Sequence, residues 1–154
     1  MEIPNHQRID FAKEQFDVAI ELFLNNRSHI AALSLAGVAE EIFGKALKDQ
    51  GKKNALKKGF ELQSFRDTEQ YKLFSKKEFS EKIYINERNQ IKNSVKHFSD
   101  NKGQSNLKTK NLDLKFQAKL MIIDAAYNYE ELGLEPTKHL NSFNEWFYET
   151  ELNH

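Results

Sequence analysis

The segment "NERNQIKNSVKHF", residues 86–98, holds the side chains best suited to chemistry in this chain. Drawn as a helix, it gathers its carboxamides and its histidine opposite an apolar stripe, namely Asn86, Asn89, Gln90, Asn93 and His97. Carboxamides can hydrogen-bond to phosphates and base edges, and a histidine titrates near neutral pH. The pattern therefore predicts a binding or catalytic face.

Two cations accompany this face. Lys92 lies on its flank, about 140° round the helix from His97, so its long side chain would have to reach round. Arg88 falls near the apolar stripe and is poorly placed to share a site with His97 along an unbroken helix. A plainer interpretation stays open, because polar helix faces are common and the helix dipole stabilises a histidine near a helix C-terminus.

The segment 31–48 is apolar nearly all round when it is drawn as a helix. One stripe is expected to be the core face, and it consists of Ala31, Leu35, Val38, Ile42 and Ala46. A second apolar sector surrounds Glu40 and consists of Leu33, Ala36, Phe43 and Leu47. We expect this helix to be buried on two sides, so the Glu40 carboxylate needs a partner or a raised pKa. Glu40 then either forms a structural ion pair or orients a catalytic or ligand-binding group.

Helical periodicity and a scarcity of helix breakers, with six Gly and two Pro, predict an all-α chain. Long helices are expected at about 5–25, 28–50, 77–98 and 112–132, and a last helix from Pro136 through 139–152. Ser28 is expected to cap the second helix, and Gly51 and Gly133 to end two helices. Residues 51–76 are expected to be a lysine-rich connection with one short helix, and 99–111 a mobile polar loop. The prediction is a single domain, 1–154, built as a bundle of four long helices plus shorter helices.

Charge and composition exclude several function classes. The 23 basic residues equal the 23 acidic ones, so the formal net charge is zero. The overall charge therefore does not indicate a nucleic acid, a membrane surface or an acidic partner. The distribution is uneven, because residues 45–82 carry a surplus of positive charge and residues 130–154 a surplus of negative charge. This basic region could face RNA or an acidic partner, or the charges could be separate solvated helix faces.

The absence of cysteine excludes disulfides and cysteine-bound zinc. Only Glu151 and His154 have Glu-x-x-His spacing, so no metal site and no cofactor are expected. No signal peptide opens the chain, and no run approaches the roughly 20 apolar residues that cross a bilayer. We therefore expect a soluble cytoplasmic protein without a membrane partner.

Two short stretches, "KNSVKH" at 92–97 and "EEIFGK" at 40–45, carry a resemblance. The first resembles the motif of the HEPN superfamily of helical bundles, in which an arginine, often followed by a polar residue, precedes a histidine by four to six residues. Lys92 stands where the family has arginine, and Arg88 is separated from His97 by eight residues. The second stretch is similar to the EExxGK of abortive-infection proteins of the AbiV type, which are also HEPN relatives. The resemblance could cover most of residues 5–132.

The resemblance implies a homodimer with the motif helices facing each other and, in catalytic members, metal-independent cleavage of RNA. It implies a role in bacterial defence or as a toxin, with a protein partner from a defence operon. His97 would be the acid and base, Lys92 the cation and Asn93 the positioning residue.

The predicted binding residues are Glu40, Asn86, Arg88 and Asn89. Because the ammonium of Lys92 lacks the planar fork of an arginine, it would orient a phosphate less well. The alternative hypothesis is therefore a non-catalytic dimeric interaction module.

Overall fold

In a computed structural model, the structure describes residues 2–62, 81–82, 85–86, 88–90 and 113–152. Within these ranges the chain forms helices and turns and no strand, so the predicted all-α class is confirmed. The elements are α1 (Asn5–Leu24), α2 (His29–Asp49), α5 (Leu114–Glu131), α6 (Lys138–Phe147) and the π-helical turn η1 (Tyr148–Leu152). Residues 55–62 are also helical, as are the short runs 81–82, 85–86 and 88–90. Most of the helix predicted at 77–98, and the loop predicted at 99–111, lie outside the described residues.

Several helix ends follow the sequence signals. The Ser28 hydroxyl accepts a hydrogen bond from the backbone N–H of Ala31 at 3.1 Å, which confirms Ser28 as the N-cap of α2. Gly51 follows α2 with a φ of 72°, and Gly133 follows α5 with a φ of 74°, as left-handed residues after helix ends do. The prediction that the last helix begins at Pro136 is wrong. Thr137 is the N-cap, because its hydroxyl accepts from the N–H of Leu140 at 3.1 Å, and α6 therefore begins after it.

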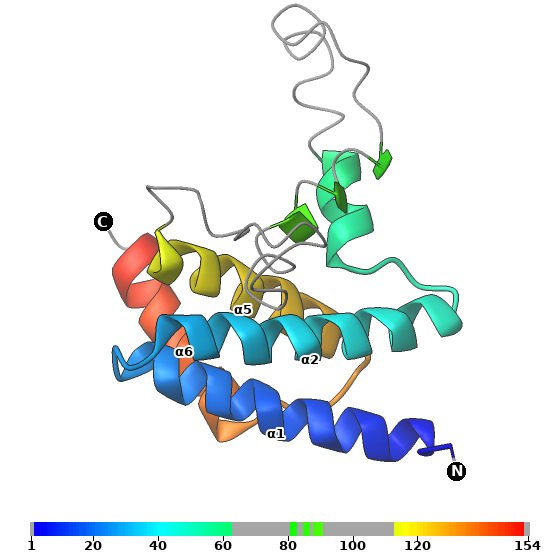
Figure 1. Cartoon of the computed structure of the whole chain (residues 1–154), viewed down its shortest axis with the longest axis horizontal. Coiled ribbons are helices and arrows are strands. Elements are labelled where there is room, and N and C mark those ends of the chain that lie inside the picture. The colour runs from blue at the N-terminus through cyan, green and yellow to red at the C-terminus, as the bar shows by residue number, and fades with distance from the viewer. Residues whose placement is uncertain (1, 63–80, 83–84, 87, 91–112, 153–154) are drawn as a thin grey trace, which may run out of the picture.

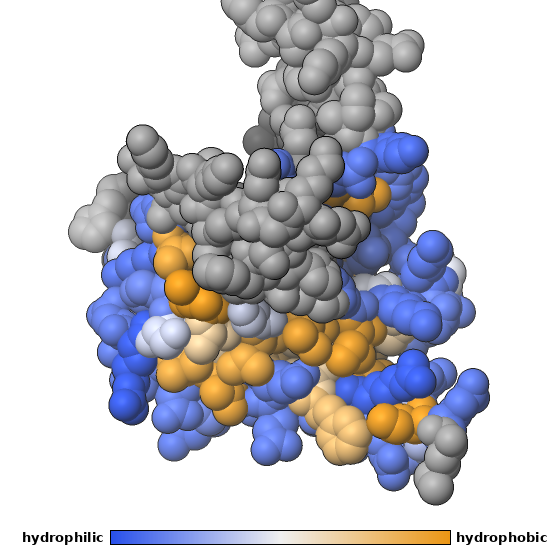
Figure 2. Space-filling model, in the orientation of Figure 1, coloured by the Kyte–Doolittle hydropathy of each residue, from blue (hydrophilic) through white to orange (hydrophobic). Residues whose placement is uncertain are grey.

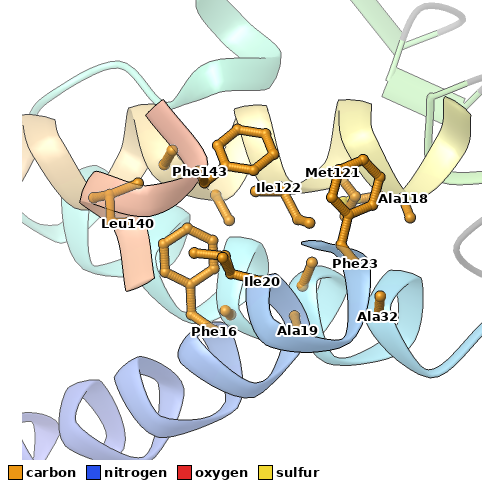
Figure 3. Packing of buried hydrophobic residues seen from close by; sticks show 14 of the residues in the cluster. Phe16, Ala19, Ile20, Phe23, Ala32, Ala118, Met121, Ile122, Leu140 and Phe143 are labelled. Atoms are coloured by element: carbon orange, nitrogen blue, oxygen red, sulfur yellow. The ribbon is translucent and has the colours of Figure 1, made fainter. Parts of the chain in front are cut away.

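Helix α2 lies between α1 and α5, and α6 packs against α1 at one end of the bundle (Figure 1). Side chains from these helices meet in one core (Figure 3). Aromatic rings connect its layers, because Phe43 of α2 lies 5.9 Å from Phe16 of α1 and 5.3 Å from Tyr129 of α5, ring centre to ring centre. Both pairs are edge-to-face, the arrangement that aromatic quadrupoles favour. The core therefore fixes α2 against both neighbours.

The burial of α2 on two sides is as predicted, but the predicted core face is wrong. The fully buried sector is the one around Glu40, and it includes Leu33, Ala36, Phe43 and Leu47. The stripe expected in the core is only half-buried, and it consists of Ala31, Leu35, Val38, Ile42 and Ala46. Both sectors are apolar, so helical periodicity alone does not tell which of them meets α5. Because Glu40 lies in the fully buried sector, its side chain is almost entirely shielded from solvent, at 3% exposure.

None of the helices within the described ranges is both long and apolar enough to span a membrane.

Tyr129 predicts a decline of stability in alkaline solution. Burial, followed by the charges of Asp17 and Glu135, raises the pKa of the Tyr129 phenol, whose O–H donates to the Glu135 backbone carbonyl. The folded state holds this proton more tightly than the unfolded chain does. The free energy of unfolding should therefore fall as the pH rises above about 10, the pKa of an unfolded tyrosine. Urea titrations across this range measure the decline, which should be shallower in Tyr129→Phe; equal slopes in both proteins would contradict the prediction.

Candidate functional site

The buried carboxamide of Asn128 joins three segments. Its Nδ2 donates to the backbone carbonyl of Glu40 in α2 at 3.1 Å, and its Oδ1 accepts from the backbone N–H of Ala55 at 2.7 Å. Asn128 is 0% exposed, so both contacts are made away from water. The N–H of Ala55 belongs to the first turn of the helix at 55–62 and has no partner within that helix. Asn128 thus positions the start of this helix against α2 and α5.

Gly44, the glycine of "EEIFGK", permits this close approach. A Cβ atom at Gly44 would lie 3.1 Å from Nδ2 of Asn128 and 3.4 Å from Nδ2 of Asn54. Asn54 is itself fixed, because its Oδ1 accepts from the backbone N–H of Lys57 at 3.0 Å and so caps the helix at 55–62. The glycine in this motif therefore has a packing role that needs no ligand.

A cavity of about 450 Å³ opens beside this junction. Its lining residues are Glu40, Glu41, Gly44, Lys45, Lys48, Asp49, Asn54, Leu56 and Asn89. Binding sites for small molecules have volumes in this range. Asn89 belongs to "NERNQIKNSVKHF" and Glu40 to "EEIFGK", so the cavity brings together the two stretches that the sequence singles out.

A lysine-rich segment contributes to the lining of the cavity. Between residues 45 and 58 there are six lysines and one acidic residue, Asp49. Three of these lysines have partners nearby. Lys53 pairs with Glu61 at 2.8 Å and Lys57 with Glu81 at 2.8 Å, and Nζ of Lys52 donates to the backbone carbonyl of Glu131 at 3.1 Å. The hydrogen bond from Lys53 lowers the pKa of the Glu61 carboxyl, and the hydrogen bond to Glu81 raises the pKa of the Lys57 ammonium.

The two lysines that line the cavity differ from these pairs. Lys45 and Lys48 are exposed, and within the described part of the chain neither makes an ion pair or a hydrogen bond through its side chain. Glu41 and Asp49 are also on the lining, so the cavity offers both signs of charge. Its free ammonium groups suit an anion, and its carboxylates and carboxamides suit hydrogen-bond donors.

Arg88 is not among the residues that line the cavity. Its guanidinium forms an ion pair with Asp124 of α5, where the side chains are 29% and 17% exposed. The Nε atom of Arg88 is buried without a hydrogen-bond partner. Asn86 is exposed and is not among the residues that line the cavity. Arg88 therefore attaches its segment to α5.

Of the predicted site residues, the structure thus brings together Glu40 and Asn89. Arg88 and Asn86 are not among the lining residues of this cavity, and Lys92, Asn93 and His97 lie outside the described residues. Sequence reasoning missed two further residues, Asn54 and Asn128. The sequence contains an indication of each residue. Asn54 directly precedes a helical run, as N-caps do, and Asn128 interrupts the apolar pattern of "IIDAAYNY".

The chain matches no protein-family model, no curated protein and no solved structure. Within the described ranges, no group of three or more His, Asp or Glu side chains is placed to hold a metal ion.

Proposed function

We propose that the protein is a HEPN-like RNA-binding protein that takes single-stranded RNA into the cavity lined by Glu40 and Asn89. The convergence of these two residues in one cavity is the observation that carries the proposal. Single-stranded RNA is recognised through phosphates and through base edges that are free of pairing. Lys45 and Lys48 would neutralise phosphates, while the carboxamide of Asn89 and the carboxylates of the lining would meet base edges.

We further propose that bound RNA is cleaved without a metal ion. In this reaction the 2′-oxygen bonds to the adjacent phosphorus, and the bond from phosphorus to the 5′-oxygen breaks. His97 takes the proton from the 2′-hydroxyl and then gives it to the leaving 5′-oxygen, and Lys92 stabilises the phosphorane charge. The sequence supports this arrangement, because helical spacing predicts Asn89, Asn93 and His97 on one face. RNA held at Asn89 would then reach His97.

The proposal includes the setting that the resemblance implies. This setting is a cytoplasmic homodimer of bacterial defence or toxin type, with a partner protein from a defence operon.

A non-catalytic dimeric interaction module is the second candidate. Two observations favour it: Lys92 replaces the expected arginine, and the nearby Arg88 is held by Asp124. In that case RNA cleavage would be absent while the fold and the cavity remain.

RNA binding has a measurable electrostatic signature. The affinity of the wild type for a fluorescent single-stranded RNA, measured by anisotropy in EDTA, should fall as the salt concentration rises. Each lysine that contacts a phosphate contributes about 0.7 to the slope of log affinity against log salt. Lys45→Ala with Lys48→Ala should therefore make the slope shallower by about 1.4.

The matched control replaces two lysines away from the cavity, Lys13→Ala with Lys115→Ala. It should keep the wild-type slope. No binding by the wild type at low salt would refute the proposed function, and equal slopes in the two double variants would refute this cavity as the site.

A further inference from the structure

A hollow of about 210 Å³ lies between the first turns of α1 and the last turns of α2. The two helices run in opposite directions, so the beginning of α1 lies beside the end of α2 (Figure 1). We call this space the end hollow. The side chains that decide its chemistry are Arg8, Ile9, Ile42, Lys45, Ala46 and Asp49.

The end hollow has an apolar wall. Ile9 and Ile42 pack against the hydrophobic core and are only partly buried, and Ala46 is half-buried on the same lining. On the face that Figure 2 shows, hydrophobic side chains lie over the middle of α1 and α2, and hydrophilic residues prevail toward the right, where these two helix ends lie. Apolar walls with a few polar groups are typical of sites for small molecules.

Three charged side chains of the end hollow lack a partner. Arg8, Lys45 and Asp49 are exposed, and within the described part of the chain none of their side chains makes an ion pair or a hydrogen bond. The two cations therefore do not pair with the carboxylate, although all three line one hollow. Lys45 and Asp49 are about 6 Å apart along α2, and Arg8 lies across from them on α1.

A zwitterion satisfies all three groups at once. A ligand carboxylate between Arg8 and Lys45 would form charge-assisted hydrogen bonds with both cations. A ligand ammonium would do the same with Asp49, one helical turn away. A ligand with a negative charge alone would leave Asp49 unpaired and would be repelled by it.

We infer that the end hollow binds a free α-amino acid with an apolar side chain, for which leucine is the probe. Its ammonium and carboxylate are attached to the same carbon, so they meet the three charged groups together. Its side chain then packs on Ile9, Ile42 and Ala46. The hollow is smaller than the roughly 300–1,000 Å³ of pockets for drug-sized ligands, which suits a molecule of this size.

The end hollow shares Lys45 and Asp49 with the cavity proposed for RNA. An amino acid that engages Lys45 withdraws this ammonium from an RNA phosphate. Leucine should therefore lower the affinity for RNA, and RNA should lower the affinity for leucine by the same factor. This coupling rests on the proposed function, whereas binding of the amino acid does not require RNA.

An NMR titration of the isotope-labelled full chain tests the inference without RNA. Leucine should shift the amide signals of residues 5–9 and 42–50 with a Kd of about 1 mM. Three matched ligands each lack one group: isocaproate lacks the ammonium, isoamylamine lacks the carboxylate, and glycine lacks the apolar side chain. Each should bind at least about tenfold more weakly than leucine.

Variants of the lining assign the charges. Asp49→Asn should abolish the preference for leucine over isocaproate, because only leucine carries an ammonium. Arg8→Ala should weaken the binding of both ligands. The matched control is Arg27→Ala, which alters an exposed arginine in the turn at the opposite end of α1 and α2, and it should bind leucine as the wild type does.

No shift of these signals at about 10 mM leucine would overturn the inference. Equal affinities of the wild type for leucine and isocaproate would overturn it too, and so would wild-type leucine affinity in Arg8→Ala. RNA anisotropy tests the coupling, since leucine should weaken RNA binding in the wild type and not in Arg8→Ala. RNA affinity that leucine leaves unchanged in the wild type would overturn the coupling, whereas binding of leucine without any binding of RNA would overturn only the proposed function.

Discussion

Replacement of Asn128 by leucine will lower the free energy of unfolding by about 1–3 kcal/mol. Leucine has a similar volume but offers no polar atoms. The N–H of Ala55 would lose its partner at this junction, and an unpaired buried group costs about 1–3 kcal/mol, whereas the carbonyl of Glu40 would keep its hydrogen bond within α2. Part of this cost is offset by the added apolar surface. The loss therefore reflects how strongly one carboxamide joins α2, α5 and the helix at 55–62.

Urea denaturation followed by circular dichroism measures this loss. Asn141→Leu is the matched control, since Asn141 is exposed on α6 and its side chain joins no other segment in the described part of the chain. The control should stay within about 0.5 kcal/mol of the wild type. A loss below about 1 kcal/mol in Asn128→Leu would show that water or a shift of the backbone replaces the carboxamide.

The largest effect on activity is expected at His97. His97→Ala should lower the rate of RNA cleavage in EDTA by about 10²–10⁴-fold, the usual contribution of a general acid or base. Binding of the same RNA should change little, because the cavity lined by Glu40 and Asn89 remains intact. Gel analysis of a labelled single-stranded RNA gives the rate, and anisotropy gives the affinity.

His139→Ala is the control for this experiment. His139 lies in α6 with Asp17 and Glu21 at 3.8 and 3.7 Å, and it is not among the residues that line the cavity. It should cleave RNA as the wild type does. Full cleavage by His97→Ala would exclude His97 as the acid or base, whereas RNA binding without cleavage by the wild type would favour the non-catalytic module.

Much of the fold could be predicted from the sequence, because helix ends are encoded locally. Ser28 caps the helix that follows it, and Gly51 adopts the left-handed conformation that ends one. The orientation of α2 could not be predicted in this way. Its two apolar sectors compete for the core, and only the packing of Phe43 between Phe16 and Tyr129 decides which sector is buried.

The candidate site could be predicted in part. Glu40 was found because a carboxylate in an apolar sector is costly, and Asn89 because carboxamides gather on one helix face. Their meeting in one cavity depends on contacts between segments far apart in the sequence. Arg88, the neighbour of Asn89, pairs with Asp124 on α5, and Asn128 on the same helix binds the backbone carbonyl of Glu40. No periodicity within a single segment reveals such contacts.

Photo-crosslinking tests the central claim, that RNA enters the cavity of Glu40 and Asn89, most directly. The wild type would be irradiated in EDTA with a single-stranded RNA that contains 4-thiouridine, and the attached peptides identified by mass spectrometry. RNA bound in this cavity should crosslink within residues 40–56 and near Asn89, and unlabelled RNA should compete all of these crosslinks away. Crosslinks confined to α6 and η1, or none at all, would contradict the claim.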